Sequence, residues 1–148
     1  MSTLLEVTDL KVRYGNIEAL HGLTFHVDEG EIVTLIGANG AGKTTTLLSI
    51  SRVYPPEGPK VVSGDIRYKG QSILGVAPDK VVSELHAVLV PEGRRIFGNL
   101  TVEENLKLAT YARKDSDADI QHDYERVYGL FPRLAERRKQ RSESLSGG

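Results

Sequence analysis

The sequence predicts a mixed α/β fold, and three features of the chain indicate it. Residues 3–9 and 23–28 alternate loosely between apolar and polar side chains on either side of turn residues 14–16, which predicts an antiparallel β start. Residues 31–36 form a short run rich in β-branched side chains, typical of a strand buried on both faces. A glycine-rich loop and the pattern of a helix follow this run directly.

The rest of the chain adds further elements and then becomes helical. The residue patterns predict, in order, a helix over 43–53, a strand over 61–68, a short helix over 78–85 and a second buried strand over 87–90. Thr101-Val-Glu-Glu104 matches a capping box, in which a hydroxyl and a carboxylate satisfy free backbone donors at the start of a helix. We therefore expect residues 101–141 to be helical.

Composition excludes several classes of protein. A chain of 148 residues with 39% hydrophobic and 26% charged residues is typical of one soluble globular domain. A net charge of −1 provides no long-range field that attracts nucleic acid, so no nucleic-acid partner is expected. The absence of cysteine excludes disulfides and cysteine-bound zinc. The apolar runs are far shorter than the roughly 18–20 residues that span a bilayer.

The most informative motif is the loop Gly37-Ala-Asn-Gly-Ala-Gly-Lys-Thr44, which matches G-x-x-x-x-G-K-[ST] between a predicted strand and a predicted helix. Backbone N–H groups converge on phosphate oxygens where missing side chains let the chain curl round the anion. The Lys43 ammonium can bridge terminal phosphates, and the Thr44 hydroxyl can ligate Mg²⁺. A dinucleotide-binding fingerprint is excluded, because Asn39 stands where it requires glycine. The loop therefore predicts a nucleotide phosphate site.

Four features in order along the chain resemble the ATP-binding subunit of an ABC transporter. They are Tyr14, the phosphate (Walker A) loop, Val90-Pro-Glu-Gly-Arg-Arg-Ile-Phe97 and Leu145-Ser-Gly-Gly148. The resemblance implies a P-loop NTPase core of the ABC ATPase type. A nucleotide-binding α/β core with the loop would occupy residues 1–100, and a helical segment ending in the ABC signature would occupy 101–148.

A narrower resemblance concerns the transported substrate. The loop, Thr101-Val-Glu-Glu-Asn-Leu106 and Leu130-Phe-Pro-Arg-Leu134 are similar to the ATPase subunit of branched-chain amino-acid importers. An importer for urea or amides is an alternative. Alternatives of another class are a non-transport P-loop nucleotide-binding protein and a small P-loop kinase.

The resemblance also implies roles for individual residues. Tyr14 would stack on adenine, Lys43 would be catalytic, and Thr44 and Glu92 would ligate Mg²⁺. Glu92 stands where most of the family has the glutamine that couples the nucleotide site to the membrane subunit. The implied nucleotide-binding residues are Tyr14, Gly37, Asn39, Gly40, Ala41, Gly42, Lys43, Thr44 and Thr45. The signature residues, which would contact the γ-phosphate on the opposite subunit, are Leu145, Ser146, Gly147 and Gly148.

The second half of the family's domain has no match in residues 1–148. The resemblance implies a Walker B strand ending in aspartate, a following glutamate and D-loop, and a later switch histidine, whereas the nearest match, residues 87–92, has Pro91 in place of the aspartate. We therefore expect a truncated core in which the terminal tetrapeptide Leu145-Ser-Gly-Gly148 is frayed. It would bind ATP or ADP but hydrolyse ATP at or near background, although the full-length protein would be an ATPase.

The implied partners are a second ATP-binding subunit, forming a homo- or heterodimer, and integral membrane permease subunits. They place the protein peripherally at the cytoplasmic face of the inner membrane. Apolar surface and unpaired strand edges left by the missing strands also predict self-association.

Overall fold

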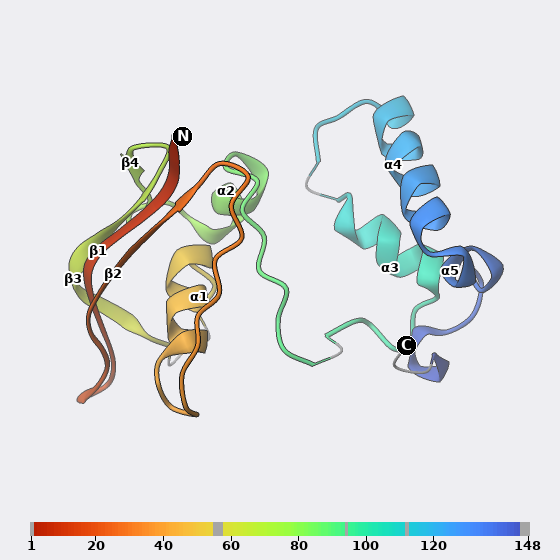
Figure 1. Cartoon of the computed structure of the whole chain (residues 1–148). Helices are drawn as coiled ribbons and strands as arrows, with labels where there is room; N and C mark the ends of the chain where they lie inside the picture. Colours follow the sequence, from red (N-terminus) through yellow and green to blue (C-terminus); the bar gives the residue numbers. More distant parts are fainter. Residues whose placement is uncertain (1, 55–57, 94, 112, 146–148) are drawn as a thin grey trace. The chain divides into compact units, whose positions relative to one another are not determined.

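The structure, a computed structural model, describes residues 2–54, 58–93, 95–111 and 113–145. The chain divides into two compact units, Met1–Val90 and Pro91–Gly148. The first unit combines a sheet with helices, and the second is helical (Figure 1). The α/β class predicted from the sequence is confirmed, with an antiparallel sheet first and helices after residue 100.

The sheet of the first unit is antiparallel throughout. Strands β1 (Thr3–Tyr14) and β2 (Ile17–Asp28) form a hairpin, and the predicted turn lies between them. Strand β3 (Lys60–Tyr68) pairs with the other side of β1, and the short β4 (Gln71–Ser72) pairs with the end of β3. The strand order is therefore β2-β1-β3-β4.

An irregularity interrupts the pairing of β1 with both of its neighbours. Asp9 has a φ of 43°, and the register shifts on both sides of β1 next to it. Gly64 of β3 lies against the bulge, where a Cβ would overlap the carbonyl oxygens of Thr8 and Asp9. Gly64 itself has a φ of +89°, which glycine adopts without strain. Glycine at this position is thus required by close approach and by backbone conformation.

The core of the first unit lies between one face of the sheet and helix α1 (Lys43–Ser51). Its buried side chains are Val7, Leu10, Val12, Leu20, Ile66 and Ile73. Ile50 of α1 packs against this cluster, as does Leu85, which follows helix α2 (Pro78–Ser83). Burying each such side chain stabilises the fold by about 1.5–3 kcal/mol. This packing holds α1, and with it the loop before α1, against the sheet.

The two predicted buried strands, 31–36 and 87–90, are wrong in this structure. Both segments lack strand pairing, and Ile32 and Ile36 are 93% and 92% exposed. Val88 and Val90 are 70% and 87% exposed. Among the described residues, no strand lies next to either segment. A strand forms only where a neighbouring strand pairs with its backbone N–H and C=O groups. The apolar pattern shows only that these segments are suited to burial.

The other predicted elements of the first unit are confirmed with shifted ends. The helix predicted over 43–53 ends at Ser51, because Arg52 adopts a left-handed conformation with a φ of 59°. The strand predicted over 61–68 begins one residue earlier, at Lys60. The helix predicted over 78–85 ends at Ser83.

The described residues of the second unit form three α-helices and a short 3₁₀ helix. They are α3 (Val102–Ala109), α4 (Asp117–Leu130), α5 (Pro132–Glu136) and η1 (Ser142–Ser144). The predicted capping box is present, because Glu104 N donates to Thr101 Oγ1 at 3.2 Å and Thr101 N donates to Glu104 Oε2 at 2.8 Å. Residues 101–141 are thus mostly helical, but the prediction is wrong for 110–111, 113–116, Phe131 and 137–141, which lie outside the helices.

Candidate phosphate-binding site

The phosphate loop, Gly37–Thr44, joins the segment 31–36, which has no regular secondary structure, to the start of α1. Its last glycine, Gly42, is the N-cap of α1 with a φ of 87°, and no side chain caps the helix. Thr46 N makes the first helical bond, to Gly42 O at 2.9 Å. Within the part of the chain that the structure describes, no acceptor is paired with the backbone N–H groups of residues 42–45. These donors, together with the positive end of the helix dipole, are suited to an anion.

The Lys43 side chain folds back across the loop. Its ammonium donates to Gly37 O at 2.6 Å and to Ala38 O at 2.8 Å. The first turn of α1 contains no acidic residue, so no carboxylate on the helix competes for this charge. A phosphate bound at the helix N-terminus would meet a cation that the loop's own carbonyl oxygens hold in place.

The last glycine of the loop fits closely against strand β2. A Cβ on Gly42 would overlap the Leu20 side chain and lie 2.9 Å from Ala19 O. This contact holds the end of the loop close to β2. The positive φ of Gly42 also disfavours any residue with a Cβ at this position. Sequence reasoning did not identify Ala19 or Leu20 as supporting residues, because nothing in the motif itself points to β2.

Tyr14 at the end of β1 contacts α1, the helix that follows the phosphate loop. The Tyr14 hydroxyl lies 3.4 Å from Thr45 Oγ1, and Thr45 is buried. The Tyr14 ring is half-buried at the end of β1, and Thr44 is exposed at the start of α1. The aromatic residue and the loop predicted from the sequence therefore belong to one continuous part of the first unit.

The remaining predicted site residues belong to the second unit. Glu92 is exposed in the bend that opens this unit. Leu145 is half-buried directly after η1, and its N–H donates to Ser142 O at 3.2 Å. The expected fraying of the terminal tetrapeptide does not include Leu145, which this bond holds to η1. Ser146, Gly147 and Gly148 lie outside the described residues.

Asn105 holds the segment that leads to the signature, a role that the sequence analysis did not identify. Its Nδ2 lies 3.0 Å from Ser142 Oγ, from Thr101 O and from Phe97 O. Its Oδ1 accepts a hydrogen bond from Phe97 N at 2.9 Å. An asparagine in a helix is a signal that its side-chain amide has a partner elsewhere. Ser142 lies 37 residues further along the chain, so residue spacing could not predict it as that partner.

Backbone bonds reinforce the same contact at the start of α3. Val102 N donates to Gln140 O at 3.1 Å, and Glu103 N donates to Arg138 O at 3.0 Å. These bonds satisfy free donors in the first turn of α3. We call residues 138–143, which supply both acceptors and also contain Ser142, the strap. The strap and α3 together position η1 and Leu145.

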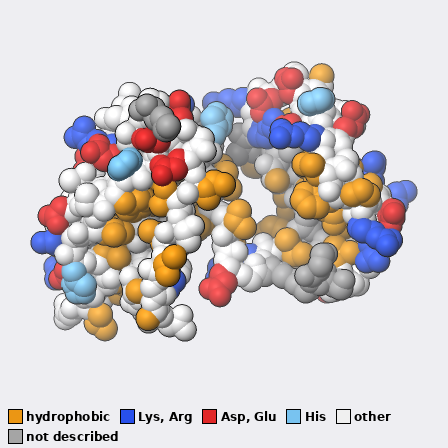
Figure 2. Space-filling view, in the orientation of Figure 1, with side chains coloured by type: hydrophobic (Ala, Val, Ile, Leu, Met, Phe, Trp, Pro, Cys, Tyr) orange, Lys and Arg blue, Asp and Glu red, His pale blue; other side chains and the backbone are white. Residues whose placement is uncertain are grey.

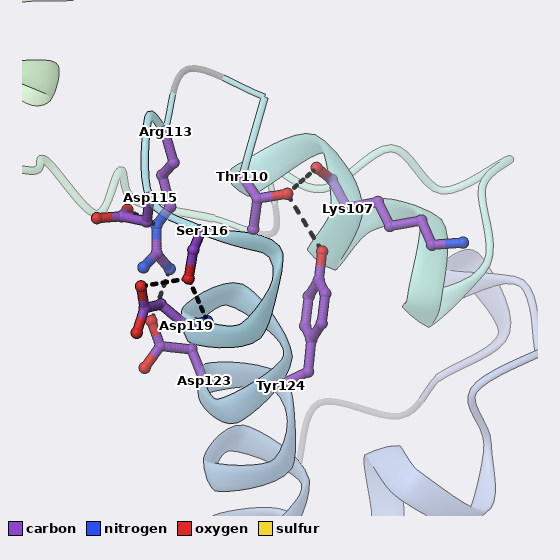
Figure 3. A network of polar contacts seen from close by, with 8 residues as sticks. All are labelled: Lys107, Thr110, Arg113, Asp115, Ser116, Asp119, Asp123 and Tyr124. Atoms are coloured by element: carbon purple, nitrogen blue, oxygen red, sulfur yellow. Dashed lines mark hydrogen bonds and ion pairs between the residues drawn. The ribbon is translucent and has the colours of Figure 1, made fainter.

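A polar network closes the loop between α3 and α4 (Figure 3). Arg113 donates to Asp115 and to Asp123, in both cases at 2.6 Å, and these contacts raise the pKa of its guanidinium above the ordinary value. The Thr110 and Tyr124 hydroxyls lie 3.2 Å apart and join the end of α3 to α4. These contacts join groups within the second unit, so we interpret the network as structural.

Across the described ranges, no group of three or more His, Cys, Asp or Glu residues could hold a metal ion by itself. No helix among the described residues is long and apolar enough to cross a bilayer.

The sequence was compared with models of known protein families, and the matched region includes the phosphate loop. A profile of the ABC transporter family matches residues 20–148. The chain belongs to the ABC transporter family. The resemblance inferred from the motifs is thereby confirmed, and the phosphate loop described above lies within the matched region of this ABC protein.

Two relatives and one solved structure resemble this ABC protein over nearly its whole length. From Pseudomonas aeruginosa, the high-affinity branched-chain amino acid transport ATP-binding protein BraG is 43% identical over 98% of the chain. BraF, with the same description and organism, is 33% identical over 93% of the chain. A solved ATP-binding subunit of an ABC transporter is 33% identical over 97% of the chain, with a TM-score of 0.79. The chain spans 59% of BraG, 49% of BraF and 56% of the solved chain.

Proposed function

We propose that this chain is the nucleotide-binding part of the energy-coupling ATPase subunit of an ABC importer for branched-chain amino acids. The observation that supports it most directly is the set of unpaired N–H groups at residues 42–45, next to the Lys43 ammonium. This is the arrangement that binds the β- and γ-phosphates of ATP. The substrate class rests on the 43% identity with BraG.

The residues of the loop have separate roles in this proposal. The backbone at Gly37, Asn39, Gly40, Ala41 and Gly42 curls round the phosphates, and Thr45 supports Tyr14 through the 3.4 Å contact of their hydroxyls. The half-buried Tyr14 ring offers adenine a stacking surface worth about 1–3 kcal/mol. Lys43 bridges the terminal phosphates and stabilises the charge that develops in the transferred phosphoryl group.

Thr44 in the first unit is suited to donate one oxygen to Mg²⁺, and the family resemblance adds Glu92 of the second unit as a further ligand. Mg²⁺ uses one or two protein oxygens together with substrate phosphates and water, so it needs no complete cage of protein ligands. Thr44 presents an exposed hydroxyl at the start of α1, and Glu92 presents an exposed carboxylate. When bound with ATP, the ion neutralises phosphate charge. We assign the coupling of nucleotide state to a membrane subunit to Glu92.

The partners follow from the same proposal. A second ATP-binding subunit would complete the site with Leu145, Ser146, Gly147 and Gly148 acting in trans, and permease subunits would hold the assembly at the cytoplasmic face of the membrane. Because the chain contains no match to Walker B or the switch histidine, we expect the 148-residue polypeptide to hydrolyse ATP at or near background.

Calorimetric titration of MgATP and MgADP into the chain tests the nucleotide site. We expect binding that weakens about tenfold or more in Lys43→Ala, because a hydrogen bond to a charged group is worth about 1.5–3 kcal/mol. Lys80→Ala is the matched control, since Lys80 is an exposed lysine of α2 outside the loop. Equal affinity of the two variants would contradict the proposed nucleotide site. Sustained turnover that depends on Lys43 would contradict only the expectation of background hydrolysis.

A chimera tests the substrate class. Residues 2–148 would replace the matching part of BraG in a strain of Pseudomonas aeruginosa that lacks BraG, and leucine uptake would be measured beside the Lys43→Ala chimera. We expect uptake that depends on Lys43. A chimera that hydrolyses ATP but supports no leucine uptake would contradict the branched-chain assignment and favour the urea or amide alternative.

A further inference from the structure

The turn within the phosphate loop carries a reactive pair of residues that the function proposed above does not use. Ala41 N donates to Ala38 O at 3.1 Å, so Asn39 and Gly40 are the two central residues of a turn. Both residues are exposed. Of the four asparagines in the chain, Asn39 is the one that glycine follows. Asparagine is thermolabile, because its side-chain amide can react with the next backbone N–H group.

The first observation is that both reacting groups lack a partner among the described residues. The Asn39 side chain makes no hydrogen bond to them, so no neighbour holds its rotation. The Gly40 N–H likewise has no acceptor there, whereas the Ala41 N–H is held in the turn. A backbone N–H that is bound in a helix or sheet must lose its hydrogen bond before it reacts. Asn39 Cγ and Gly40 N are therefore able to meet.

The second observation is the open space beside Gly40. A Cβ on Gly40 would meet no heavy atom of the described residues within 4 Å, apart from its chain neighbours. Glycine also has no side chain of its own that would block an approach to its N atom. The residues after the other three asparagines are Ile17, Leu100 and Leu106, which all have branched side chains. The space needed for the reaction therefore distinguishes Asn39 from the other asparagines.

The third observation is the positive charge of the loop. The Lys43 ammonium donates to Ala38 O at 2.8 Å, directly before Asn39 in the chain. The N-terminus of α1 adds the positive end of the helix dipole, and the first turn of α1 contains no acidic residue. The attacking group is Gly40 N after it has lost its proton, which is an anion. The field that attracts phosphate therefore favours this species as well.

We propose that Asn39 is a site of spontaneous covalent modification in the phosphate loop. Gly40 N gives its proton to hydroxide and forms a bond to Asn39 Cγ, while the Cγ–Nδ2 bond breaks and the amide nitrogen leaves as ammonia with a proton from water. The product is a neutral succinimide ring. Water then adds to one of the two ring carbonyl carbons, and the bond from that carbon to nitrogen breaks to give aspartate or isoaspartate. The chain loses ammonia and gains water, with no oxidation or reduction.

The modification is expected to oppose nucleotide binding, a consequence that rests on the function proposed above. Either product places a carboxylate in a loop whose donors would face phosphate, and like charges brought together repel. Isoaspartate also adds a carbon atom to the backbone, which disturbs the curl that lets N–H groups converge on an anion. Conversely, a phosphate held by the Gly40 N–H would withdraw this group from the reaction. Bound nucleotide is therefore expected to protect Asn39.

Ageing of the purified chain at mildly alkaline pH tests the chemistry by itself. Peptide mass spectrometry measures the modification at each asparagine, and an isoaspartate methyltransferase assay measures isoaspartate. We expect modification at Asn39 to be faster than at Asn16 and Asn99, which are exposed and serve as controls in the same sample. We also expect the rate at Asn39 to rise with pH, because Gly40 N must lose a proton before it attacks.

Calorimetric titration of MgATP tests the consequence. The modified chain, separated by ion exchange, is expected to bind MgATP about tenfold or more weakly than the unmodified chain, because its added carboxylate repels phosphate. Asn39→Ser is the matched control, since it has no side-chain amide, and its aged sample is expected to keep the affinity of its own fresh sample. MgATP at about a hundred times its Kd leaves about 1% of the chains free, so its presence during ageing is expected to slow modification by up to about a hundredfold.

Three results would overturn the proposal. One is modification at Asn39 that is no faster than at Asn16 and Asn99. A second is equal affinity of the modified and unmodified chains for MgATP. The third is an unchanged rate at Asn39 when MgATP saturates the chain. If Asn39 is modified but the fresh chain binds no MgATP, the proposed nucleotide site and the consequence for binding are contradicted, whereas the modification chemistry is supported.

Discussion

Replacing Asn105 with alanine is expected to loosen the strap that leads to the signature. The Asn105 amide has one acceptor and two donor hydrogens, so it can make three strong hydrogen bonds at once among its partners at 2.9–3.0 Å. Each is worth about 0.5–1.5 kcal/mol net, and the higher helix propensity of alanine offsets about 0.5 kcal/mol. We therefore expect local destabilisation of about 1–4 kcal/mol. The loss of a partner for the buried Ser142 hydroxyl acts in the same direction.

Native-state hydrogen exchange measures this local stability. Amides at 97–101 and 138–143 are expected to exchange about five- to several-hundredfold faster in Asn105→Ala, while amides of β1 keep their rates. Asn99→Ala serves as the control, since Asn99 is an exposed asparagine in the preceding turn. Unchanged exchange at both segments in Asn105→Ala would refute the conclusion that this amide holds the strap.

Three further predictions concern the loop, the exposed segments and pH. Gly42→Ala is expected to weaken MgATP binding at least tenfold by calorimetry, because its Cβ would overlap the Leu20 side chain; unchanged affinity would contradict the close fit against β2. The chain is expected to self-associate in sedimentation through its exposed apolar segments (Figure 2), with Ile36→Thr reducing association and the exposed Ile17→Thr leaving it unchanged. The hydrogen bond from Thr101 lowers the pKa of Glu104, so the stability that it adds to α3 is full above the ordinary glutamate pKa of about 4.3 and is lost as pH falls through the lower folded pKa. Hydrogen exchange of α3 measured against pH checks this, and Glu104→Gln is expected to flatten the dependence.

Local chemistry explains which parts of the fold could be predicted. The hairpin turn, the capping box of Thr101 and the start of α1 depend on residues within a few positions of one another, and all three are confirmed. The strands expected over 31–36 and 87–90 failed because strand pairing depends on neighbours that a residue pattern does not contain. Their exposed side chains remain suited to burial against further strands.

The site shows the same division between local motif and distant support. The G-x-x-x-x-G-K-T pattern determined the loop, its lysine and the free donors of α1, because all of them lie within eight consecutive residues. The tertiary structure decided that Gly42 rests on β2 and that Asn105 bonds to Ser142. Each of these depends on groups brought together by packing from distant parts of a unit. No periodicity or spacing in the sequence encodes such contacts directly, since only folding creates them.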